Sequence, residues 1–153
     1  MLCSIVNNPY IVAAHEAHGK SNQRRRPVGR KVISTDEAPA PVATYSQAVR
    51  SGPVVAVAGQ VGVAPSGEVV GPGVAEQTDR ALRNVEAILV AAGLTMGDAL
   101  RVDCFLADLS DLAEFNRAYA AWFPREGPAR TTVGARLAPG LRVQVAVLAV
   151  APS

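Results

Sequence analysis

Apolar residues recur along the chain with two different periods, and each period predicts a different kind of element. Over residues 74–92 they recur every three or four positions, the spacing of one helix face. The residues on this stripe are Val74, Ala81, Leu82, Val85, Ile88, Leu89 and Ala92. Gly93 then predicts the end of the helix. A second apolar stripe predicts a helix that Ser110 caps and Pro124 ends. Its members are Leu112, Phe115, Tyr119, Trp122 and Phe123.

Strands are predicted by short apolar runs and by strict alternation. Val54–Ala58 is an apolar run, and residues 100–107 alternate, with Leu100, Val102, Cys104 and Leu106 on one face. Residues 130–135 and 142–150 follow the second helix. From Val32 onward the predicted order is β-β-α-β-α-β-β. Parallel, right-handed crossovers then place both helices on one face of a single sheet, which is an α+β fold.

The last predicted strand is apolar on both of its faces. Val143, Val145, Val147 and Ala149 point one way, and Ala146, Leu148 and Val150 point the other. Two helices cover only one face of the sheet, and a large bare apolar face is unusual in a soluble monomer. We therefore expect an obligate oligomer in which another subunit covers the second face.

The composition suits one folded domain after a short leader. The chain has 153 residues, of which 49% are hydrophobic and 18% charged, enough apolar material for a core. No apolar run approaches the ~18 residues of a membrane span, so no membrane partner is expected. Residues 1–31 show no sustained period and hold a basic cluster. They are predicted to be a flexible basic leader, and residues 32–153 the domain.

Charge and cysteine content bear on the compartment. The formal charge of +2 comes from the leader, where Arg24, Arg25, Arg26, Arg30 and Lys31 gather. The two cysteines, Cys3 and Cys104, do not form a disulfide framework, which favours a reducing cytoplasm. The arginine-rich leader leaves a mitochondrial presequence open as an alternative. Cys104 is expected to be a small buried apolar residue.

The candidate chemistry is limited by what the folded part contains. It has no histidine, which excludes histidine-based acid–base chemistry, and no zinc, nucleotide or nucleophile-elbow motif. No metal and no cofactor are expected. Arg130 opens a strand after Gly127 and Pro128, and a fixed guanidinium is suited to binding a carboxylate. The alternative for Arg130 alone is a solvated charge at the sheet edge.

Five segments together resemble one known family. They are Tyr45-Ser46-Gln47-Ala48, Ala58-Gly59-Gln60, the helix from Gln77 with Leu82, Asn84 and Val85, Phe115-Asn116 with Tyr119 and Trp122, and Pro128-Ala129-Arg130-Thr131. In this order they resemble the motifs of the Rid family (reactive intermediate deaminases, or YjgF-like proteins). The resemblance covers about residues 32–151.

The resemblance implies a fold, an activity and a site. The fold is the chorismate-mutase-like YjgF fold, assembled as a homotrimer with sites between subunits. The activity is hydrolysis of 2-imino acids, or their enamine tautomers, to 2-keto acids and ammonia without a cofactor. Arg130 would grip the substrate carboxylate, and Tyr45 and Gln144 would join it as catalytic residues. The implied substrate-binding positions are Arg130, Tyr45, Ala58, Gly59, Asn116 and Thr132.

Departures from the family pattern leave the function open. Ala58 stands where a serine is frequent, and Thr132 where a cysteine is frequent. Gln144 and Ala146 stand where well-studied deaminases carry two glutamates, the first of which positions the hydrolytic water. Glutamine can hold a water but cannot take its proton at neutral pH. The chain is therefore expected to be a slow imine deaminase.

Three alternatives remain at this stage. One is a non-catalytic carboxylate-binding module that keeps the arginine. Another is a deaminase of a different pathway intermediate, of the aminoacrylate or aminomuconate type. The third is RNA cleavage, but the folded part has no basic stripe with interleaved aromatic residues, which argues against a nucleic-acid partner.

Overall fold

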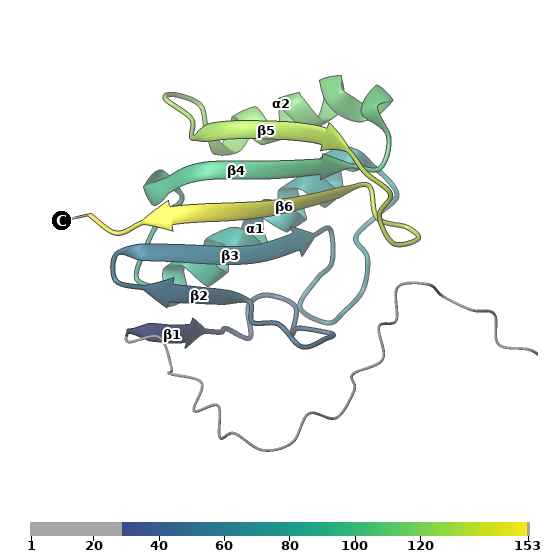
Figure 1. Ribbon diagram of the computed structural model, residues 1–153. Helices are drawn as coiled ribbons and strands as arrows, with labels where there is room; N and C mark the ends of the chain where they lie inside the picture. The colour runs from purple at the N-terminus through teal and green to yellow at the C-terminus, as the bar shows by residue number, and fades with distance from the viewer. Residues whose placement is uncertain (1–28, 153) are drawn as a thin grey trace, which may run out of the picture.

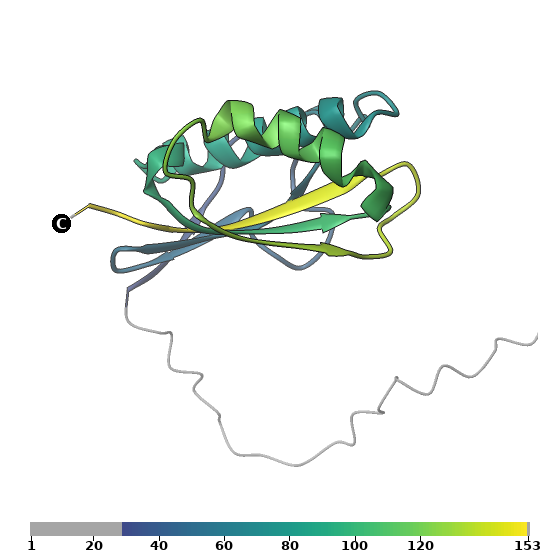
Figure 2. The same ribbon diagram turned by 90° about the horizontal axis from the view of Figure 1, so that it is seen from above.

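The computed structural model describes residues 29–152, which form a two-layer α+β domain. In chain order the elements are β1 (Arg30–Ile33), β2 (Ala48–Ser51), β3 (Val54–Val61), α1 (Val74–Ala91), β4 (Ala99–Leu106), α2 (Leu112–Trp122), β5 (Ala129–Gly134) and β6 (Val143–Val150). The strands form one sheet in the order β1-β2-β3-β6-β4-β5. Both helices lie on the same face of this sheet (Figures 1 and 2), so the predicted fold class is confirmed. Among the described helices, none is long and apolar enough to cross a membrane.

The sheet is mixed, and its pairing agrees with the predicted crossovers. β3 and β4 both pair antiparallel with β6, so they run parallel to each other, with α1 between them in the chain. β4 and β5 pair directly and in parallel, with α2 between them. Three strands precede α1, whereas the sequence predicted two. The first of them starts at Arg30, inside the predicted leader, and the leader up to residue 28 lies outside the described residues.

The buried face of α1 is the stripe that the sequence predicted. Leu82, Val85, Ile88 and Leu89 have no exposed surface and lie against the inward-facing residues of β3, β4 and β6. The helix ends as expected, because Gly93 takes a φ of +75° that favours glycine. The Leu94 amide then donates to the Leu89 carbonyl at 2.8 Å, which satisfies a carbonyl in the last turn.

Two local predictions are wrong. Leu100 does not share the buried face of β4, because the pairing of β4 with β6 shifts between Ala99 and Arg101 and leaves Leu100 58% exposed. Ser110 does not cap α2. Its amide donates instead to the side chain of Asp108, which caps a single 3-10 turn just before α2. A bulge and a 3-10 turn both interrupt the regular period on which the predictions depended.

In the part of the chain that the structure describes, neither helix covers the second face of the sheet (Figure 2). Along β6 every second residue from Val143 to Ala149 is buried under the helices, and the residues between them are half-buried. Val54, Leu100 and Val133 are 38%, 58% and 43% exposed. Among residues 29–152, Figure 2 shows no helix or strand over this face. The structure therefore leaves an apolar surface where the sequence analysis expected a partner.

Candidate functional site

Arg130 lies at the edge of the sheet, on the side that the helices cover. Its strand neighbour is Val102, which has no exposed surface, so both side chains face α2. One guanidinium NH₂ group of Arg130 donates to the Asn116 Oδ1 at 2.8 Å. The guanidinium carbon lies 4.7 Å from the ring centre of Tyr119 and 5.4 Å from that of Phe115. A strand and a helix thus hold this cation in place by one hydrogen bond and two cation–π contacts.

Among residues 29–152 no carboxylate forms an ion pair with Arg130. A guanidinium has five N–H donors in a planar fork, and the contact with Asn116 uses one of them. The remaining donors are available to a ligand, because Arg130 is exposed. A carboxylate matches this geometry with two parallel hydrogen bonds. We call Arg130, Asn116, Phe115, Tyr119 and Thr132 the Arg130 cluster.

Beneath Arg130 the side chains are polar but neutral. Burial raises the pKa of the Cys104 thiol to about 11, although the Arg130 charge opposes this rise. Burial also raises the pKa of the Tyr119 hydroxyl to about 12, and Arg130 again opposes it. Thr132 is the strand neighbour of Cys104, and its hydroxyl is buried. None of these groups is ionised at neutral pH, so none can serve as a general base there.

A pocket of about 440 Å³ lies between the end of β3 and the loop before β2. Tyr45 lines it, and the Tyr45 hydroxyl accepts a long hydrogen bond of 3.4 Å from the Val42 amide. No lining side chain is charged. We call it the Tyr45 pocket. Its walls include Val42, Tyr45, Gly59, Val61, Val63 and Leu141.

Gln144 lies beside this pocket, against Gly59. A Cβ added to Gly59 would lie 2.5 Å from the Gln144 Nε2, closer than two such atoms can approach. Gly59 is part of an irregular stretch of β3, since the pairing with β6 shifts between Val57 and Gln60. Ala58 lies in the same stretch, and its amide donates to the Gln47 carbonyl at 2.9 Å. The absence of a side chain at Gly59 therefore makes room for Gln144.

The predicted site residues form two separate groups in one chain. Tyr45, Ala58, Gly59 and Gln144 gather around the Tyr45 pocket, and Asn116, Arg130 and Thr132 belong to the Arg130 cluster. β6 and β4 lie between β3 and β5 (Figure 1), which places those two strands about 14 Å apart at ~4.8 Å per strand. Gln144 is paired with Phe105 on the open face, whereas Arg130 faces the helices. A small substrate cannot contact both groups within one chain.

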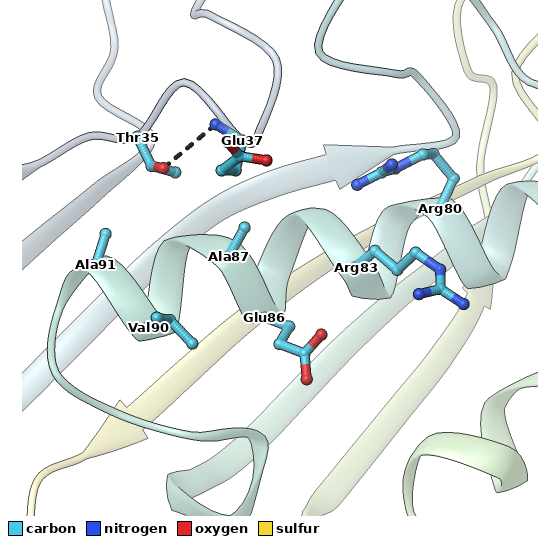
Figure 3. Close-up of a pocket in the computed structure, with 8 residues that line it drawn as sticks. All are labelled: Thr35, Glu37, Arg80, Arg83, Glu86, Ala87, Val90 and Ala91. Atoms are coloured by element: carbon cyan, nitrogen blue, oxygen red, sulfur yellow. Dashed lines mark hydrogen bonds between the residues drawn. The ribbon is translucent and has the colours of Figure 1, made fainter.

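A second hollow, of about 430 Å³, lies between α1 and the loop after β1 (Figure 3). Its cations are Arg80 and Arg83, and its anions are Glu37 and Glu86. Arg83 is already paired with Asp79 at 2.7 Å. No predicted site residue lines this hollow. Its balanced charges also give a carboxylate no clear advantage there, so it is not the candidate site.

Sequence reasoning missed several residues that the structure brings to the two groups. Phe115 and Tyr119 were predicted as the apolar side of a helix, yet their rings lie under Arg130. The signal was available, because aromatic residues four apart flank Asn116 on one helical turn. Val61 is the last residue of β3, and Val63 and Leu141 lie outside the named strands; none of the three gave a signal. Within residues 29–152 no three histidine, cysteine or acidic side chains gather as a metal site.

The fold and the site together define a small α+β domain whose sheet edge carries a guanidinium without a carboxylate partner among residues 29–152. The family model described as endoribonuclease L-PSP matches residues 35–151, and the chain belongs to this family, also known as YjgF/Rid. The rat protein named 2-iminobutanoate/2-iminopropanoate deaminase is 41% identical over 123 residues, which are 79% of this chain and 90% of that protein.

Two solved structures from Escherichia coli are similar to this chain. The yjgF gene product is 38% identical with a TM-score of 0.74, over 78% of this chain and 98% of that one. TdcF, solved with bound serine, is 35% identical with a TM-score of 0.76, over 80% of this chain and 99% of that one. The predicted family and fold are therefore confirmed.

Proposed function

We propose that this protein hydrolyses 2-imino acids to 2-keto acids and ammonia. The observation that carries the proposal is Arg130, an exposed guanidinium fixed by Asn116 and two aromatic rings, with no carboxylate partner in the described chain. A 2-imino acid supplies the missing carboxylate. The name of the rat relative and the serine bound to TdcF both support a small ligand that carries a carboxylate and a nitrogen on adjacent carbons.

The complete site is formed between two copies of the chain. The Arg130 cluster and the Tyr45 pocket lie on different strands and face opposite sides of the sheet, so one chain offers two half-sites. A neighbouring copy can bring its Tyr45 pocket to the Arg130 cluster, and such contacts also cover the apolar face of the sheet. A closed ring of three copies, as in the family, repeats this contact three times.

The proposed chemistry relies on position more than on acid–base groups. Arg130 holds the carboxylate, which fixes the imine carbon relative to a water held by Gln144 of the neighbouring copy. The water oxygen forms a bond to C2 and one water proton passes to the imine nitrogen, which gives a tetrahedral carbon that carries a hydroxyl and an amine. The hydroxyl proton then also passes to the nitrogen, C2–O becomes a carbonyl, and the C2–N bond breaks as ammonia leaves. Positioning alone can lower a barrier by several kcal/mol. Without a carboxylate at position 144, the ~10²–10⁴-fold gain from a general base is missing.

Gln144 also favours a second candidate, a non-catalytic carboxylate-binding module. Such a protein would keep the Arg130 fork and bind keto or amino acids without turning over imines. A deaminase of an aminoacrylate-type or aminomuconate-type intermediate would use the same two half-sites on a different substrate. RNA cleavage is the least supported alternative, since the candidate pocket carries no charge.

The test is direct measurement of imine hydrolysis. An amino-acid oxidase generates 2-iminopropanoate from alanine, and semicarbazide traps the imine that survives. We expect added protein to lower the rate of semicarbazone formation in proportion to its concentration. The Arg130→Ala variant should leave the rate of semicarbazone formation unchanged. Binding of 2-oxobutanoate by calorimetry without any effect on the imine would favour the non-catalytic module instead.

A further inference from the structure

Gln77 is a buried polar residue in the first turn of α1. It has no exposed surface, although it lies on the stripe that packs against the sheet. Its Nε2 donates to the carbonyls of Gly71 at 3.1 Å and Gly140 at 2.8 Å, and its Oε1 accepts from the Arg142 amide at 2.8 Å. One side chain thus joins α1 to the loop just before it and to the loop before β6, which is 63 residues away.

Two of these bonds fix a wall of the Tyr45 pocket. Leu141 lines the pocket, and its two chain neighbours are the residues that Gln77 bonds, Gly140 and Arg142. The backbone is therefore held on both sides of Leu141. The same loop leads directly into β6, where Gln144 follows Arg142 by two residues. The bonds of Gln77 thus set the position of both Leu141 and the start of β6.

Gln77 also supports the opposite wall by close packing. A Cβ added to Gly62 would lie 2.4 Å from the Gln77 Cβ, so the backbone there presses directly on α1. Gly62 lies between Val61 and Val63, both of which line the pocket. Two turns further along α1, the buried Asn84 donates to the carbonyls of Val61 and Val63 at 3.2 and 2.9 Å. Both pocket walls are therefore built on α1.

A continuous set of contacts joins Gln77 to the Arg130 cluster as well. The side chain of Arg142 forms an ion pair with Asp111, the residue before α2. On α2, Asn116 accepts the hydrogen bond from Arg130. The loop at residues 140–142 is therefore linked to the helix that carries Asn116.

We propose that Gln77 is a positioning residue for the reaction. It sets the distance between the Leu141 wall, the Val61–Val63 wall and Gln144, and it does so without contacting substrate. This inference rests on the proposed function, because it concerns the rate of that reaction. Misplacement of reacting groups by about 1 Å can cost on the order of a hundredfold in rate. Loss of the three bonds allows a displacement of that size.

The test compares Gln77→Met with Leu89→Ala. Methionine has a similar length but makes none of the three bonds, while Leu89 is fully buried in the last turn of α1, away from the pocket. Both changes should lower the melting temperature, so kinetics are measured well below either midpoint. We expect kcat for 2-iminopropanoate to fall about tenfold or more in Gln77→Met and less than twofold in Leu89→Ala. The Kd for 2-oxobutanoate should stay within about threefold of wild type, because Arg130 is intact.

The outcomes separate the two proposals. An active wild type with equal kcat in both variants would refute the positioning role and leave the proposed function standing. A wild type without imine hydrolysis would refute both. If Gln77→Met does not fold, Gln77→Glu replaces it. Glutamate keeps the acceptor for the Arg142 amide but loses both donors, so kcat should again fall while that of Leu89→Ala does not.

Discussion

Gly59 and Gln144 lie so close together that no side chain fits between them. A Cβ on Gly59 would lie 2.5 Å from the Nε2, 2.7 Å from the Cδ and 3.0 Å from the Cγ of Gln144. Two strands, β3 and β6, carry these residues, and the irregular pairing of β3 at this point brings Gly59 under the glutamine. The geometry fixes where the Gln144 amide lies relative to the Tyr45 pocket.

The first prediction concerns this contact. Gly59→Ala should push the Gln144 side chain away from its position and lower kcat for 2-iminopropanoate about tenfold, in line with the cost of small misplacements. In a Gln144→Ala background the added methyl has nothing to displace. The double variant should therefore be no slower than Gln144→Ala alone. Independent, multiplicative losses in this double-mutant cycle would show that the two residues do not act together.

The second prediction concerns the two half-sites. Arg130→Ala should no longer bind the substrate carboxylate, and Arg130→Lys should lose most of this binding because lysine lacks the planar fork. A Gly59→Leu variant should block the Tyr45 pocket. Each variant alone should be inactive. When Arg130→Ala and Gly59→Leu chains are unfolded and refolded together in equal amounts, about a quarter of wild-type activity should return. An intact site needs Arg130 from one chain and an open Tyr45 pocket from its neighbour, and random assortment around a closed ring supplies this pair at about one site in four.

The control for this experiment is the same pair mixed without unfolding. Subunits that do not exchange should regain no activity. If jointly refolded variants stay inactive while each binds its neighbours normally, the two groups do not form one site.

The third prediction concerns the open face of the sheet. Leu148 is half-buried in the middle of β6, on the face without helices. Leu148→Glu would place a charge in an apolar interface, where an unpaired charge is costly. Sedimentation equilibrium at micromolar concentration should give a trimer for wild type and a monomer for Leu148→Glu. A monomeric wild type that still hydrolyses imines would contradict both the interface and the shared site.

The fourth prediction concerns alkaline pH. The ordinary pKa of the Cys104 thiol is 9.0, and burial raises it to about 11 in the folded protein. The unfolded chain therefore releases this proton first. The stabilisation is fully present below pH 9 and is lost as the pH rises toward 11, by on the order of 2 to 3 kcal/mol.

Melting temperature against pH checks this expectation. It should decline between pH 9 and 11 in wild type, more steeply than in Cys104→Ala, which lacks the thiol. A second decline at higher pH is expected from Tyr119, whose pKa is raised to about 12. Parallel curves for the two proteins would rule out Cys104 as a source of the alkaline loss.

The regular elements could be predicted from the sequence because their apolar periods are long. The stripe from Val74 to Ala92 covers five turns and is hard to mistake for another pattern. β1 and β2 have four residues each, too few for a period to be recognised. The bulge at Leu100 turns its side chain away from the buried face of β4. No pattern within a single strand reveals the pairing that causes such a bulge.

The site was only partly predictable, for a similar reason. Family motifs identified Arg130, Tyr45 and Gln144, but not which face of the sheet each side chain occupies. That depends on the pairing register of β5 with β4 and of β6 with β3, which is a tertiary property. The buried position of Gln77 is equally invisible, because its three partners come from loops 6, 63 and 65 residues away.

The last prediction concerns Gln144 itself. On the open face its strand neighbours are Val61 and Phe105, both apolar, so neither of these two neighbours offers it a cation. In the proposed trimer the neighbouring Arg130 approaches it from across the interface. A glutamate at this position would be kept ionised by that charge. It has nearly the shape of glutamine, so packing against Gly59 changes little.

We therefore expect Gln144→Glu to raise kcat for 2-iminopropanoate at pH 7–8 by about tenfold or more, the lower part of the range for a general base. KM should change little, because Arg130 still binds the carboxylate. Gln144→Met, which has a similar length but cannot hold a water, should be slower than wild type. The three proteins are compared with freshly generated imine in one assay. If wild type equals Gln144→Glu and Gln144→Met equals both, the water is activated elsewhere, and the side chain at position 144 only fills space beside Gly59.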